Sequence, residues 1–401
     1  MVPGSTASNL LLATLSVVVA LGAAELALRT VQPPLPDYLV LAPGTYRTPA
    51  PAPGILPGVT GASAARVNRF GLRGRTFGDD RAEFRILAVG GSTTRCSVLD
   101  DTEVWTHLLE VGLGRTADGR RVWVGNAGRD GATTRDYVLH LKYLLRQYPR
   151  IDVVVVLAGV NDLMSALHQG WSYRLPVAVT EPSAEAEEMG RAFAVVLGGE
   201  PPPRDHGSGE HAWYRATALW QLGRRVKVAW QAHRTVGLHD VGEHFLEAAR
   251  LHRRTAGTWF DSLPPLGPPL TEYHRNLDTM ADLATAAGAR LVLVTQPSAW
   301  RNGMSDAEER LLWFGWVGGD VPSAWAYFTT RALARAMARY NDVLLAVCHE
   351  RGLDCVDAAT LIPRDTTALY DDVHFNEHGS HLFAQALVER FRRGPPFRSP
   401  N

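Results

Sequence analysis

The chain has 401 residues, of which 46% are hydrophobic, enough to build one large domain or two. Lysine plus arginine and aspartate plus glutamate each number 41, so the formal net charge is zero. This balance excludes the strong basic excess that is typical of nucleic-acid-binding proteins, and we expect no nucleic-acid partner.

The first part of the chain is apolar. Leu10 to Leu28 is almost wholly apolar and approaches the ~20 residues that span a bilayer. We therefore expect residues 1–31 to form a single-pass membrane anchor. A signal peptide that is cleaved to release a secreted protein is the alternative, because Gly22 and Ala24 are small enough for a cleavage site. Against cleavage, residues 1–9 lack the usual lysine or arginine.

A proline-rich stretch follows the apolar segment. Residues 32–65 contain eight prolines, which predicts an extended spacer between the membrane and the body of the protein at 66–395. The arginines after the segment favour a cytoplasmic body by the positive-inside rule. That rule is weak here, because long domains cross membranes largely regardless of their charge.

The body alternates short apolar runs with amphipathic helical patterns, which predicts an α/β fold with a parallel sheet covered on both faces. The run Asp152–Leu157 is apolar on both faces, as a central parallel strand must be. The predicted strands are 85–90, 121–125, 152–157, 290–295 and 353–356, and the predicted helices are 104–114, 133–147, 271–287 and 328–351.

Two segments, 163–270 and 299–326, interrupt the alternation and contain nine of the eleven tryptophans. We interpret them as insertions, largely helical, in which indoles form small cores. The alternative is an aromatic surface beside the site that binds sugar rings or acyl chains.

Polar motifs follow the first three strands, at the sheet edge where such folds bind ligands. They are Gly90-Gly91-Ser92-Thr93, Gly125-Asn126-Ala127-Gly128 and Gly159-Val160-Asn161-Asp162. Each alone is typical of an ordinary turn. Together they offer a hydroxyl, a close backbone N–H and a side-chain amide at one edge.

A fourth motif, Asp371-Asp372-Val373-His374, lies near the C-terminus. Residues three apart share one side of a helical turn, so we expect Asp371 to orient His374. Asp372 is expected to point elsewhere and cap the turn. The three cysteines have no metal-site spacing, and we expect unpaired thiols, with a Cys348–Cys355 disulfide as the alternative in an oxidising compartment.

The order and spacing of the four motifs resemble the SGNH hydrolases, the GDSL-type esterases and lipases. The resemblance implies a flavodoxin-like three-layer α/β/α sandwich, with Ser92 as nucleophile, His374 as base and Asp371 as its orienting acid. It assigns the oxyanion hole to Ser92, Gly128 and Asn161.

The resemblance also gives supporting positions to Gly159 and Asp162. Asn68-Arg69-Phe70-Gly71-Leu72-Arg73-Gly74 resembles a segment of membrane-anchored bacterial members, which implies an extracytoplasmic body. Residue 91 departs from the family, which usually has aspartate there.

We therefore expect a serine esterase that acts on a carboxylic ester, such as an O-acetyl group of a glycan or a lipid ester, without a cofactor or metal. An O-acyltransferase with the same triad is the main alternative. Two others are a zinc hydrolase using the His-x-x-Glu-His pattern of His374, Glu377 and His378, and an inactive glycan-binding module.

Overall fold

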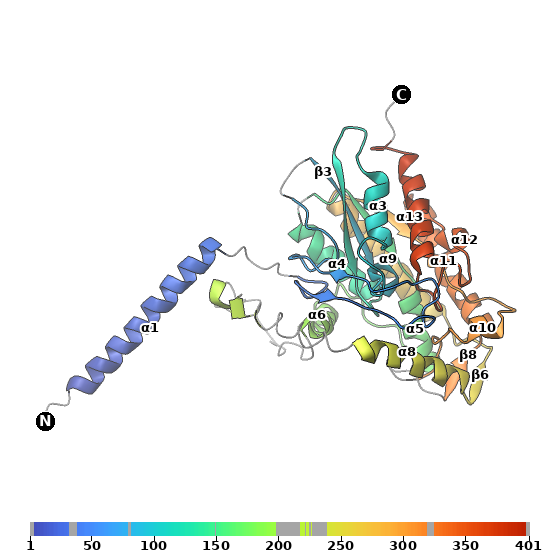
Figure 1. The fold of residues 1–401 in the computed structure, drawn as a ribbon, viewed down its shortest axis with the longest axis horizontal. Helices are drawn as coiled ribbons and strands as arrows, with labels where there is room; N and C mark the ends of the chain where they lie inside the picture. Colours follow the sequence, from blue (N-terminus) through green and yellow to red (C-terminus); the bar gives the residue numbers. More distant parts are fainter. Residues whose placement is uncertain are drawn as a thin grey trace.

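The computed structural model begins with one long helix, α1 (Gly4–Val31), which extends away from the body (Figure 1). Its segment Ser8–Val31 is long and apolar enough to cross a membrane, and none of this window is buried in the body. An N-terminal helix of this kind is consistent with a membrane anchor or a signal sequence. The structure describes residues 4–31, 38–78, 82–148, 150–197, 217–220, 222–223, 226, 239–318 and 325–397.

The core of the body is a five-stranded parallel sheet in the order β4-β3-β5-β7-β9. In chain order this is 2-1-3-4-5, the doubly wound flavodoxin-like arrangement, so the expected fold class is confirmed. All residues of β3 and β5 are buried, because helices cover both faces of the sheet. The strands are β3 (Glu83–Gly90), β4 (Arg121–Gly128), β5 (Val153–Leu157), β7 (Arg290–Val294) and β9 (Asp354–Val356).

Two groups of helices form the outer layers. Helices α3 (Trp105–Leu113) and α13 (Glu377–Arg392) pack side by side on one face (Figure 1). Helix α9 (Gly267–Ala286) packs between α4 (Thr134–Gln147) and α11 (Thr330–Arg351) on the other. A short helix, α12 (Ala358–Leu361), links β9 to the segment before α13.

Part of the expected spacer at 32–65 packs on the body. Residues 38–41 are buried, and the Tyr38 hydroxyl lies 2.6 Å from His140 Nδ1. Strand β1 (Tyr46–Arg47) pairs antiparallel with β2 (Ala65–Arg66). Residues 38–41 of the predicted linker therefore pack on the body, whereas most of residues 42–62 are exposed or half-buried.

The first insertion begins within α5 (Val160–Gln169). It contains η1 (Gly170–Ser172), α6 (Pro182–Leu197), α8 (His239–Arg254) and β6 (Thr258–Phe260). The second contains α10 (Asp306–Glu309) and leads into β8 (Ala326–Phe328), which pairs parallel with β6. Their tryptophans differ in exposure. Trp300 and Trp316 are buried, whereas Trp171, Trp259 and Trp325 are exposed.

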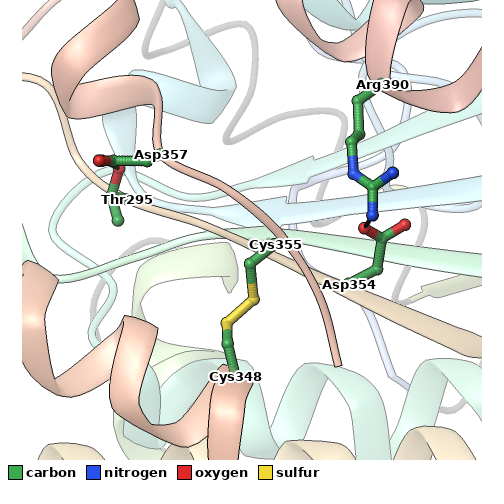
Figure 2. The surroundings of a disulfide bond; sticks show 6 residues. All are labelled: Thr295, Cys348, Asp354, Cys355, Asp357 and Arg390. Carbon is green, nitrogen blue, oxygen red and sulfur yellow. Dashed lines mark hydrogen bonds and ion pairs between the residues drawn. A yellow bond between two sulfur atoms is a disulfide. The ribbon is translucent and has the colours of Figure 1, made fainter. Parts of the chain in front are cut away.

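A disulfide joins the end of α11 to the edge strand of the sheet (Figure 2). Gly352 ends α11 in the left-handed conformation and turns the chain back, so that Cys348 and Cys355 lie with their Cα atoms 6.3 Å apart. The expectation of unpaired thiols was wrong for this pair and holds for Cys96, which is free and buried.

Replacing Cys348 and Cys355 with serine should lower the free energy of unfolding by about 2–3 kcal/mol, because the bridge closes a short loop in the unfolded chain. Urea denaturation with and without reductant measures this. The wild-type protein should lose the same amount in reductant, and the double variant should not respond. With the disulfide formed, the denatured and unreduced protein should have one titratable thiol, that of Cys96. Three titratable thiols would contradict the pairing.

Candidate active site

Ser92 stands on a tight turn between β3 and the short helix α2 (Ser92–Arg95). A side chain on either of the two glycines before Ser92 would crowd this turn. A Cβ atom on Gly90 would lie 2.0 Å from Thr94 Oγ1, and one on Gly91 would lie 2.4 Å from Asn161 Nδ2. The strand therefore ends in a crowded corner that delivers the partly exposed Ser92 hydroxyl to the edge of the sheet.

The structure brings Ser92, His374 and Asp371 into one hydrogen-bonded chain. Ser92 Oγ lies 2.7 Å from His374 Nε2, and His374 Nδ1 lies 2.8 Å from Asp371 Oδ2. With a proton on Nδ1 held by the carboxylate, Nε2 is free to accept the serine proton. A hydroxyl, an imidazole and a carboxylate in this order are the groups needed for nucleophilic catalysis.

The charge of Asp371 sets the protonation of His374. Burial alone disfavours the imidazolium, but the charge and hydrogen bond of Asp371 outweigh it, so the pKa of His374 is raised. Burial likewise opposes ionisation of Asp371. The charge of His374 and hydrogen bonds from His374 and Trp313 reverse that effect and lower the pKa of Asp371.

Two aromatic rings limit the rotation of the imidazole. The Tyr370 ring stacks on His374 with centroids 5.5 Å apart and planes 9° apart. The Phe314 ring meets the imidazole at 84°, with centroids 6.0 Å apart. His374 is therefore held between a neighbour in its own segment and a residue of the second insertion.

Gly128 and Asn161 both reach the turn that carries Ser92. A Cβ on Gly128 would lie 2.3 Å from the backbone nitrogen of Arg95, so only glycine allows this approach of β4 to α2. The Gly128 N–H donates to Asn126 Oδ1 at 2.9 Å. Asn161 Nδ2 donates to the Ala132 carbonyl at 2.8 Å.

Gly159 and Asp162 shape the segment that presents Asn161. Gly159 precedes α5 with φ +123°, a conformation that side chains rarely adopt. Asp162 accepts hydrogen bonds from the backbone and hydroxyl of Thr134, at 3.1 and 2.5 Å, and so ties α5 to α4. Burial raises the pKa of Asp162 to about 7.

Asp372 does not cap the turn, and that expectation was wrong. The side chain is fully buried and accepts hydrogen bonds from Trp300 Nε1 at 2.7 Å and the backbone nitrogen of Trp313 at 2.8 Å. Sequence reasoning also missed the Trp313 indole, which donates to Asp371 Oδ2 at 3.0 Å. No sequence pattern signals either contact, because the partners come from distant parts of the chain.

The histidines of the His-x-x-Glu-His pattern do not share a helical face. His374 lies before α13 and bonds Ser92, whereas Glu377 accepts from the Thr60 hydroxyl. His381 Nε2 lies 2.8 Å from Glu103. Within the part of the chain that the structure describes, no group of three or more metal-ligating side chains is placed to hold an ion. The zinc alternative therefore gains no support from the geometry.

Several solved structures are similar in fold to this chain. A member of the lipolytic G-D-S-L family from Veillonella parvula has 12% identity and a TM-score of 0.38, covering 78% of this chain and all of that one. The acetylxylan esterase Axe2 from Geobacillus stearothermophilus has 13% identity and a TM-score of 0.37, covering 77% of this chain and 93% of its own.

LAE5, an α/β hydrolase from the metagenome of Lake Arreo, has 15% identity and a TM-score of 0.38, covering 77% of this chain and 94% of its own. No protein-family model matches the sequence, and no curated protein matches it. At these identities and scores the likeness concerns the fold alone.

Replacing Asp371 with asparagine should lower the pKa of His374, because it removes the charge that outweighs burial. An NMR titration of the His374 ring protons measures the change. Asp130→Asn is the matched control, since Asp130 also raises this pKa but contributes less than Asp371. An unchanged His374 titration in Asp371→Asn would contradict the conclusion that the charge of Asp371 raises the pKa of His374.

Proposed function

We propose that the protein is a serine esterase of the SGNH or GDSL type, which hydrolyses a carboxylic ester through an acyl-enzyme on Ser92. The observation that carries the proposal is the hydrogen-bonded chain from Ser92 through His374 to Asp371, with contacts of 2.7 and 2.8 Å. This chain lies at the carboxyl edge of a doubly wound sheet, where such folds place their sites.

In the proposed reaction, Ser92 Oγ attacks the ester carbonyl while His374 Nε2 takes the hydroxyl proton. The negative charge that develops on the carbonyl oxygen is stabilised by the backbone N–H of Ser92 and by Asn161 Nδ2. The Gly128 N–H joins them by exchanging its bond to Asn126 Oδ1 for one to the oxyanion. His374 then gives its proton to the departing alcohol. Water repeats the sequence in reverse, releasing a carboxylic acid and restoring the Ser92 hydroxyl.

The substrate class that we propose is an ester with an accessible acyl group, such as an O-acetyl group on a glycan or a lipid ester. We also propose that α1 anchors the protein in a membrane and that its body lies outside the cytoplasm. The Cys348–Cys355 disulfide supports that side of the membrane, because disulfides persist mainly in oxidising compartments.

Ser92→Ala should lower kcat for a short-chain p-nitrophenyl ester by several orders of magnitude, up to about 10⁶-fold as for a triad member that acts with its partners. A fluorophosphonate probe should label the wild-type protein on Ser92 and leave the variant unlabelled. A chelator should leave activity unchanged. Activity retained in Ser92→Ala would disprove the proposal.

Gly91→Ala should lower kcat by about 10-fold or more. The added Cβ would lie 2.4 Å from Asn161 Nδ2, which is too close, so the amide would have to move. Asn161→Ala gives the reference, with an expected loss of roughly 10²–10³-fold for one oxyanion donor. In the double variant the two losses should not multiply, since both act through the same amide. Independent, multiplying losses would argue against this role for Asn161.

A further inference from the structure

We propose that Trp313 is a positioning residue for the reaction, and that its indole N–H holds the Asp371 carboxylate in the orientation that aligns His374 with Ser92. This inference rests on the proposed function and extends it, because it makes the second insertion part of the catalytic apparatus. Trp313 itself touches neither Ser92 nor the imidazole through any hydrogen bond in the described structure.

The Asp371 carboxylate accepts four N–H groups. Oδ1 accepts the backbone N–H groups of Val373 and His374 at 3.0 and 2.9 Å, and Oδ2 accepts His374 Nδ1 at 2.8 Å. These three donors come from the same turn as the carboxylate. The fourth is Trp313 Nε1, at 3.0 Å from Oδ2, and it arrives from the insertion. Trp313 therefore fixes the carboxylate against a separate part of the fold.

Trp313 is itself held firmly. Its backbone N–H and that of Phe314 donate to Asp372 Oδ2 at 2.8 and 3.2 Å. At the start of the insertion, Ala299 N donates to the Asp372 carbonyl at 2.8 Å. Asp372 thus binds the insertion at its start and near its middle, while the neighbouring Asp371 receives the indole.

Aromatic packing completes the support of the indole. The Trp313 and Trp316 rings stack with centroids 6.2 Å apart and planes 17° apart. Phe245 of α8 meets the Trp313 ring edge-on at 5.7 Å. From the same helix, Arg253 Nη1 donates to the Phe314 carbonyl at 2.7 Å.

The hydrogen bond from the indole N–H also stabilises the negative charge of Asp371. Without this bond the carboxylate should interact more strongly with the imidazolium of His374. The pKa of His374 should then rise further. The other groups that face His374 stay in place: the charges of Asp130 and Asp372, and the ring of Tyr370, whose backbone carbonyl accepts from Arg250. A shift in the titration of His374 therefore reports the lost hydrogen bond.

The sharpest test replaces Trp313 with β-(3-benzothienyl)alanine, which keeps the shape of the side chain and puts sulfur in place of the N–H. We expect kcat to fall about 10-fold, in the range for one hydrogen bond to a charged group, with KM changed less than about 2-fold. The acid limb of the kcat/KM profile and the NMR titration of His374 should both move to higher pH.

Trp325→Phe is the matched control, since it removes an exposed indole of the same insertion and should leave the His374 titration unchanged. Trp313→Phe should reproduce the loss in kcat if the smaller ring is accommodated, and the isosteric analogue keeps the test valid if it is not. Wild-type kcat and an unshifted His374 titration in the analogue would overturn the role of Trp313, while labelling of Ser92 would still stand.

Ester hydrolysis and fluorophosphonate labelling of the wild-type protein test the proposed function independently of Trp313. A wild-type protein that neither hydrolyses esters nor reacts with fluorophosphonate would overturn both the esterase and the catalytic role of Trp313. The His374 titration would then still report whether the indole acts on Asp371 and His374.

Discussion

The burial of two consecutive carboxylates is the constraint on which the site depends. Asp371 and Asp372 are almost completely inaccessible to solvent, and a buried charge is costly unless hydrogen bonds or opposite charges compensate it. The compensating groups come from three parts of the chain. Asp371 accepts hydrogen bonds from nearby backbone N–H groups and from the imidazole of His374. Both carboxylates accept hydrogen bonds from the second insertion. The buried Arg250 and Arg253 of α8 contribute positive charge nearby.

The parallel register of the sheet explains how distant motifs meet. Gly90 pairs with Gly128 on one side and with Leu157 on the other, so the three strands end at the same level. The segments that follow therefore emerge together. Ser92 and Asn161 lie in the first turns of their helices within one corner, and the missing side chain at Gly91 leaves the space that Asn161 occupies. The glycine at this position is thus part of the packing of the site.

The insertions are joined to this framework rather than appended to it. The second insertion is bound through Asp372, and the first sends α8 against it, where Arg250 donates to the Leu311 carbonyl and Arg253 to the Phe314 carbonyl. Parallel pairing of β6 with β8 links the two. A substitution in either insertion can therefore alter the environment of His374 without touching it.

The sequence by itself determined the features that depend on local pattern. Apolar runs located all five strands of the main sheet within a few residues, and the three-residue spacing of Asp371 and His374 set their contact within one turn. The polar residues at the strand ends were also visible, because the parallel topology leaves them one edge to share.

Only the tertiary structure decided what depends on contacts between distant segments. The burial of residues 38–41, the pairing of Cys348 with Cys355 and the partners of Asp372 follow from which surfaces meet after the chain has folded. Trp313 is the clearest case. Its indole reaches Asp371 across 58 residues of sequence, and hydrophobic periodicity carries no information about which buried carboxylate an insertion will meet.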